Sequence, residues 1–134
     1  MSKRSLLGII EPSTFRQNVV EIVALIPDGR VLSYGDVATL AGSARAARAV
    51  GTILKTANED LPWHRVINST MAVSGSHFDG RPLRQIQLLQ AEGHTIGHQG
   101  RIHDPTCRWP LEDAYDAWHA SGASTPLQTR PDDE

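Results

Sequence analysis

The stretch SYGDVATLAGSARAARAVGTIL, residues 33–54, predicts two short helices joined by a tight turn. Ser33 and Asp36 have the spacing of a capping box, so the first helix is expected to begin directly after Ser33. Gly42 suits the left-handed backbone position that ends a helix. Ser43 can then cap a second helix whose apolar residues continue to the end of the stretch. Two short helices around such a turn make a helix-turn-helix.

The second helix of this pair has an unusual surface. Ala46, Ala47 and Ala49 are small, and Arg48 stands among them. Small side chains let a helix backbone approach another surface closely, and a lone long cation can then reach into that surface. The alternative interpretation is an alanine-rich helix packed in a core, with Arg48 on an ordinary solvated face.

Upstream of this stretch, apolar residues at helical spacing predict a helix that is capped by Ser13 or Thr14 and ended by the turn at residues 27–29. Val31-Leu32 has the character of a small strand. Downstream, Pro82 marks the first turn of a helix that runs to Glu92, and Gly93 is its expected C-cap.

Two irregular segments flank that last helix. Residues 71–74 suggest a hairpin or wing, and the wing region extends over Ser74 to Arg84. Residues 95–96 and 101–102, split by glycines, predict a final irregular hairpin. The fold class that follows is mainly α with short β elements.

The heptad LPWHRVI, residues 61–67, places a large ring, an imidazole and a guanidinium side by side. Pro62 fixes its own φ and moves the residue before it away from the helical region, so the chain is extended or turning here. Val66 and Ile67 read as a short buried strand. Trp63 and His64 on this stiff backbone suggest part of a pocket; the alternative is a core Trp63 and an exposed His64.

Composition bounds the function. The 134 residues amount to one domain, with no apolar run of membrane-spanning length and no signal peptide. The single cysteine, Cys107, fits a reducing cytoplasm. Six acids and one base give residues 111–134 a charge of −5, which leaves +3 for residues 1–110. A basic face masked by an acidic tail is compatible with DNA binding.

Other chemistry has weaker support. His94, His98, His103 and Cys107 are separated by three, four and three residues, which superficially resembles a zinc set. The intervening glycines argue against convergence, so no metal or other cofactor is expected. No phosphate-binding glycine loop and no nucleophile elbow are visible.

Four ordered motifs carry a family resemblance. LPWHRV at 61–66 resembles the Pro-Cys-His-Arg-Val motif of O6-alkylguanine-DNA alkyltransferases, with Trp63 where that family has its acceptor cysteine. SYGDVA at 33–38 and AARAVG at 46–51 are similar to the family's helix-turn-helix, and LLQAEG at 88–93 to its closing helix. The resemblance covers about residues 13–110. Trp at the cysteine position is typical of the alkyltransferase-like subfamily.

The resemblance implies a winged helix-turn-helix and assigns roles. Arg48 enters the DNA stack from the minor groove, and Tyr34 helps to rotate the target nucleotide. Trp63 and Val66 line the pocket for a flipped guanine, His64 and Glu92 form a hydrogen-bonded pair, and Arg65 is structural. The implied DNA-binding residues are Tyr34, Ser43, Ala46, Ala47, Arg48, Ala49 and Gly51, and the implied lesion pocket is Tyr34, Trp63, His64, Val66 and Glu92.

The implied function is a cytoplasmic, monomeric and non-enzymatic sensor that binds O6-alkylguanine in double-stranded DNA and directs it to nucleotide excision repair proteins (UvrA-type in bacteria). The alternatives are a suicide alkyltransferase that uses Cys107 and a winged-helix transcription regulator. The implied organisation is a flexible arm at 1–12, the DNA-binding domain at 13–110 and an acidic, disordered tail at 111–134, with a weak helical pattern over 111–120.

Overall fold

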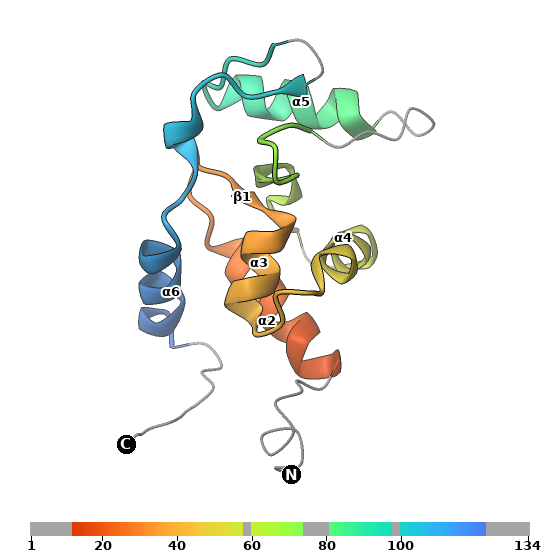
Figure 1. Cartoon of the computed structure of the whole chain (residues 1–134), viewed down its shortest axis with the longest axis vertical. Coiled ribbons are helices and arrows are strands. Elements are labelled where there is room, and N and C mark those ends of the chain that lie inside the picture. The colour runs from red at the N-terminus through yellow and green to blue at the C-terminus, as the bar shows by residue number, and fades with distance from the viewer. Residues whose placement is uncertain (1–11, 58–59, 74–80, 98–99, 123–134) are drawn as a thin grey trace.

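The computed structural model describes residues 12–57, 60–73, 81–97 and 100–122 (Figure 1). Helices dominate these residues, with one pair of two-residue strands. The elements in chain order are α2 (Pro12–Ala24), β1 (Leu32–Ser33), α3 (Tyr34–Ala41), α4 (Ala47–Thr56), the 3₁₀ turn η1 (Trp63–Arg65), β2 (Val66–Ile67), α5 (Arg81–Ala91), the 3₁₀ turn η3 (Pro105–Cys107) and α6 (Leu111–Ala120).

The helix-turn-helix is confirmed as α3, a tight turn and α4. The Ser33 hydroxyl accepts from the Asp36 amide at 2.9 Å, and the Asp36 carboxylate accepts from the Ser33 amide at 3.0 Å, so the capping box is complete. Gly42 adopts a φ of 111° and closes α3. A side chain at this φ would be strained, so glycine allows the abrupt turn into α4.

The predicted N-cap of α4 is wrong. The N-cap residue is Ala46, and it makes no side-chain capping bond. The amide of Ser43 donates to the Ala38 carbonyl at 2.9 Å, and its carbonyl accepts from the Ala46 amide at 3.0 Å. Because the Ser43 backbone takes part in ending α3, it cannot also begin α4, and one turn of chain separates the two helices.

Two apolar clusters meet at the strand pair. β1 and β2 run parallel, with Leu32 opposite Val66 and Ser33 opposite Ile67. Leu32 and Val66 join the larger cluster, which α2, α3, α4 and α6 build. Ile67, with Val31 just before β1, joins a smaller cluster that includes Leu89 of α5. In Figure 1, β1 accordingly lies between α5 and the group formed by the other helices.

The weak helical pattern over residues 111–120 is confirmed as α6, which packs on the domain, so this part of the expected tail is folded. Trp118 is only 2% exposed and Ala114 only 1%. The indole of Trp118 donates to Glu21 of α2 at 2.9 Å. The acidic residues occupy the outer face of α6, and the apolar stripe between them buries enough surface to fix the helix.

The other predicted segments are described in part. The final hairpin is confirmed by an antiparallel bridge between Ile96 and Ile102, and a second bridge joins Ala72 to Arg101. Outside the described residues lie much of the expected wing (residues 74–80), His98, residues 1–11 of the expected arm and the end of the tail (123–134). The last residue of the expected arm, Pro12, begins α2. No helix within the described ranges is long and apolar enough to span a bilayer.

Trp118→Ala tests the packing of α6. Truncating a buried Trp removes apolar contact and leaves a cavity, so we expect a loss of about 3–5 kcal/mol in the free energy of unfolding. Tyr115→Ala is the matched control on the same helix, because Tyr115 is 48% exposed. Chemical denaturation measures both variants. Equal midpoints for Trp118→Ala and the wild type would show that α6 is not part of the cooperative fold.

Candidate nucleic-acid interface

A groove on the outer side of α4 carries most of the predicted DNA-binding residues. Its lining comprises Tyr34, Ala47, Arg48, Gly51, Thr52 and Lys55, and its volume is about 450 Å³. Two cations and no carboxylate line it, so its field attracts anions. Arg48 and Lys55 are exposed at a spacing of seven residues, which places both on one face of α4. Thr52 belongs to this face, although only the helical spacing from Arg48 could have revealed it.

Gly51 gives this groove an open floor. A Cβ atom at Gly51 would lie 3.9 Å from the Tyr34 ring, which is an ordinary contact. Packing of Tyr34 on α4 therefore does not require glycine. The missing side chain instead exposes helix backbone between the two cations, where a surface can approach closely.

Three predicted residues lie outside this lining. Ser43 is half-buried in the turn before α4, Ala46 is half-buried and packs against the core, and Ala49 is exposed on α4. The structure thus brings Tyr34, Ala47, Arg48 and Gly51 together and sets Ser43, Ala46 and Ala49 around them.

Trp63 and His64 project from η1, the turn that leads into β2. The Trp63 ring meets the His64 imidazole edge to face, with centroids 6.2 Å apart and planes at 88°. Trp63 is half-buried, so the alternative that places it in the core is wrong. The turn forms because Pro62 directly before it fixes the backbone, and the Arg65 amide donates to the Pro62 carbonyl at 3.0 Å.

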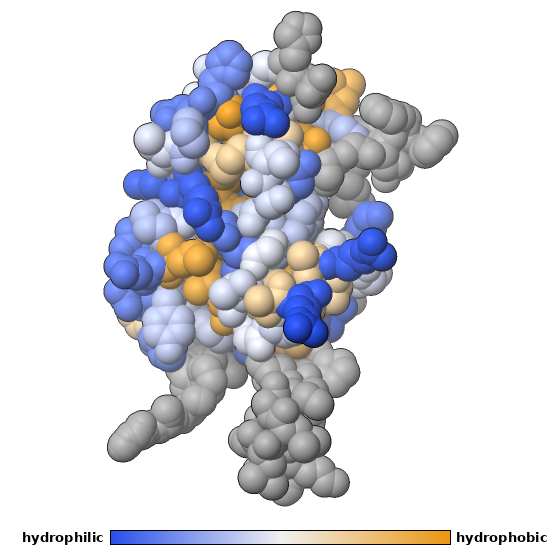
Figure 2. All heavy atoms as spheres, in the orientation of Figure 1, coloured by the Kyte–Doolittle hydropathy of each residue, from blue (hydrophilic) through white to orange (hydrophobic). Residues whose placement is uncertain are grey.

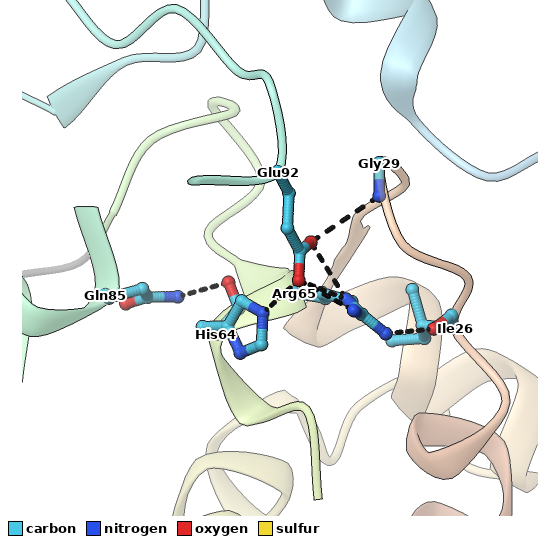
Figure 3. A network of polar contacts seen from close by, with 6 residues as sticks. All are labelled: Ile26, Gly29, His64, Arg65, Gln85 and Glu92. Carbon is cyan, nitrogen blue, oxygen red and sulfur yellow. Dashed lines mark hydrogen bonds and ion pairs between the residues drawn. The ribbon is translucent and has the colours of Figure 1, made fainter. Parts of the chain in front are cut away.

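Glu92 anchors this turn, as Figure 3 shows. Its carboxylate accepts from His64 Nε2 at 2.7 Å and from Arg65 Nη2 at 2.6 Å. Arg65 also donates through Nη1 to the Ile26 carbonyl at 2.7 Å. The pairing of His64 with Glu92 and the structural role of Arg65 are both present in these contacts. Gly93, with φ of 97°, ends α5 directly after Glu92 and so fixes where the carboxylate points.

This environment holds Glu92 ionised. Burial opposes its charge, but the hydrogen bonds from Arg65 and His64 outweigh that cost and lower the pKa of Glu92 from 4.5 to about 2. Its side chain is 12% exposed, as is that of His64. A charge-assisted, bidentate contact with Arg65 at this depth is a rigid connection rather than a loose surface pair.

Gln85 of α5 is a site residue that sequence reasoning missed. It is 3% exposed, and its Nε2 donates to the carbonyls of His64 at 3.0 Å and Val66 at 2.9 Å. These bonds clamp both sides of Arg65 to α5. The available signal was a polar residue one turn before the buried Leu89, on the stripe where an apolar residue is expected.

The predicted role of the Val66 side chain is wrong. Val66 is 0% exposed, and its side chain belongs to the larger apolar cluster. Both residues of β2 are fully buried, because side chains alternate along a strand: Val66 enters the larger cluster and Ile67 the smaller one.

These features define a class of protein. A helix-turn-helix with a basic, small-residue groove on its second helix has the build of a DNA-binding domain. Residues 14–94 match the family model described as "6-O-methylguanine DNA methyltransferase, DNA binding domain". The chain belongs to this family, in its alkyltransferase-like branch.

The similar proteins include both base-flipping proteins and methyltransferases. The chain is 48% identical over 100 residues to the DNA base-flipping protein of Escherichia coli, a match that covers 72% of this chain and 74% of that protein. It is 36% identical over 92 residues to the human methylated-DNA–protein-cysteine methyltransferase, covering 67% of this chain and 44% of that protein. Among solved structures, Schizosaccharomyces pombe Atl1 in complex with damaged DNA containing O6-carboxymethylguanine matches with a TM-score of 0.68 and 31% identity, covering 75% of this chain and 98% of that chain.

Glu92→Gln tests the anchor. At neutral pH the variant loses the charged partner of Arg65, so we expect about 2–3 kcal/mol less stability. The depressed pKa makes this contribution fully present above pH 4.5 and removes it as the pH falls toward 2. Denaturation should therefore show that the difference in the free energy of unfolding between wild type and variant shrinks as the pH falls from 7 to 2.5. The control is the exposed Glu112→Gln, and a pH-independent gap for Glu92→Gln would contradict the assignment.

Proposed function

We propose that this protein is a non-enzymatic sensor that binds O6-alkylguanine in duplex DNA, extrudes the damaged base and leaves the alkyl group in place. The observation that carries the proposal is the His64–Glu92 pair, joined at 2.7 Å directly after Trp63, the residue that the resemblance places at the position of the acceptor cysteine. A thiolate can attack carbon in such a site, whereas an indole offers no comparable nucleophilic lone pair. The exchange removes the reaction and keeps the scaffold for recognition.

The proposed binding mode follows from the basic groove. A guanine within a duplex must leave the base stack before a pocket can inspect it, at a cost of a few kcal/mol. Arg48, exposed among small residues on α4, is placed to fill the vacated space and to offset part of that cost. Tyr34 lines the same groove, next to where the backbone of the extruded nucleotide would pass. Trp63 and His64 would then meet the base.

The chemistry of Cys107 argues against the suicide alkyltransferase. Cys107 is the only thiol in the chain. It lies in η3, where it is half-buried beside the smaller apolar cluster. Burial raises the pKa of this thiol, and the nearby Asp104 carboxylate raises it further. A thiol that resists ionisation is a poor nucleophile.

We further propose that the bound lesion is handed to nucleotide excision repair proteins. A protein without turnover contributes to repair only by marking the site for others, and flipping exposes a distorted duplex that a damage-recognition protein can detect. The proposed state is a monomer on double-stranded DNA in the cytoplasm, nucleoid-associated while bound.

Arg48→Ala tests the binding mode. Loss of the inserted side chain should lower the affinity for lesion-containing DNA about tenfold or more. The affinity for undamaged DNA should fall less, because only the flipped base leaves a gap in the stack that Arg48 would fill. Arg45→Ala is the matched control, since Arg45 is exposed in the preceding turn and lies outside the groove lining. The Arg45→Ala variant should bind both duplexes slightly more weakly than the wild type, and this loss of affinity should depend on salt. Titration of O6-methylguanine and guanine duplexes measures this. Equal losses for both variants on both duplexes would overturn the proposed role.

Trp63→Cys tests whether the site retains its activating pair. The new thiol would lie next to His64, whose partner Glu92 is ionised, so we expect transfer of a labelled methyl group from O6-methylguanine DNA to the protein. Trp63→Ser is the control of equal size and should transfer none. Adding Glu92→Gln to Trp63→Cys should slow the transfer. A Trp63→Cys variant that binds the lesion without any transfer would show that the pair is purely structural.

A further inference from the structure

A second groove lies between α3 and α6, away from the basic groove. Its lining comprises Thr39, Leu40, Leu111, Glu112, Tyr115 and Asp116, and its volume is about 460 Å³. The basic groove is almost the same size, so charge and polarity distinguish the two. This groove has two carboxylates and no cation, with two leucines and a tyrosine between them. In Figure 2 a hydrophobic patch is visible over α3 and α6, bordered by hydrophilic residues.

The two grooves face different sides of the domain. In Figure 1, α4 and α6 lie on opposite flanks of α3. DNA bound along α4 would leave the α3–α6 groove open. Its carboxylates also repel phosphate, so nucleic acid is the wrong occupant. The α6 side of this groove lies beyond the matched residues 14–94, whereas its α3 side, Thr39 and Leu40, lies within them.

Tyr115 is the most exposed apolar side chain in this groove. It is 48% exposed and lies next to Leu40 and Leu111, so it belongs to an apolar patch rather than standing alone. Its ring contacts the His119 ring with centroids 4.1 Å apart, so its orientation is held before anything binds. A pre-oriented exposed tyrosine beside half-buried leucines is typical of the residues that dominate binding energy at protein interfaces.

We propose that the α3–α6 groove docks a partner protein through a basic amphipathic helix. Apolar side chains of that helix would cover Leu40, Leu111 and Tyr115, while its lysines or arginines would face Glu112 and Asp116. The proposal goes beyond lesion binding and does not require it.

The charge of the α3–α6 groove argues against two other occupants, a second copy of this chain and the chain's own C-terminal segment. A second copy of this chain would place acidic grooves against each other, which costs free energy. The chain's own C-terminal segment, residues 121–134, has three acids, one base and a single large apolar residue, Leu127. It offers neither the cations nor the helical apolar stripe that the groove would bind.

The test is a selection from a library of random 16-residue peptides displayed against the full chain, with counterselection on the double variant Glu112→Lys/Asp116→Lys. We expect enriched peptides with apolar residues at i, i+3 or i+4 and i+7, flanked by lysine or arginine. Against the enriched peptides, Tyr115→Ala should lose roughly tenfold or more in affinity, as expected for an aromatic anchor. The double variant should lose affinity mainly at low salt.

Leu83→Ala is the matched control, because Leu83 on α5 is exposed at 61% and lies outside the groove. It should bind the peptides as the wild type does, and DNA affinity should persist in the groove variants, which shows that they fold. Acidic peptides, peptides indifferent to Tyr115→Ala or no enrichment would each overturn the proposal. Concentration-dependent self-association that the double variant abolishes would overturn it in favour of a second copy.

Discussion

The carboxylate of Glu92 is the contact on which the arrangement of this site depends. It lies at the end of α5, yet it binds the imidazole of His64 and the guanidinium of Arg65 in η1, while Arg65 reaches the Ile26 carbonyl after α2. One charged group therefore joins three segments that are far apart in the chain (Figure 3). Two apolar clusters meet here, and neither alone fixes how α5 is oriented toward the helix-turn-helix. Apolar contacts are non-directional, whereas these hydrogen bonds set a defined angle and depth.

This dependence gives a reason for the pair to persist in a site without a thiol. In an alkyl-accepting site, a His–Glu pair would serve the chemistry by favouring the thiolate. Here the same Glu92 also neutralises the half-buried Arg65 and holds η1 in place. Removing it would leave a desolvated cation and release the turn that carries Trp63. A change at residue 63 therefore leaves these contacts in place, while loss of the Glu92 carboxylate removes them and destabilises the fold.

Local sequence rules predicted the parts of the fold that short-range chemistry controls. The Ser33–Asp36 capping box and the Gly42 turn were readable because their partners lie within a few residues, and both are present. The pairing of His64 with Glu92 spans 28 residues, and only the family resemblance suggested it. Gln85 was missed because its two acceptors are backbone carbonyls, which leave no mark in the sequence.

Tertiary packing decided the remainder. The acidic residues of α6 suggested a solvated tail, but Trp118 and Ala114 bury a stripe between those charges. Averaging charge over 111–134 concealed that stripe, because composition does not record which face of a helix a residue occupies. Val66 was assigned to a pocket from its position in a motif, but apolar clusters lie on both sides of β2, and Val66 is buried in the larger one. Motif position identifies a residue's neighbourhood, and the backbone decides whether its side chain faces the ligand.

We propose that this site recognises O6-alkylguanine and cannot accept its alkyl group. The most direct measurement is intact-mass spectrometry of the wild-type protein after it has been saturated with an O6-methylguanine duplex, with the DNA from the same sample analysed for the lesion. We expect an unchanged protein mass and full recovery of O6-methylguanine. A protein heavier by one methyl group, with the matching loss of the lesion from the DNA, would contradict it.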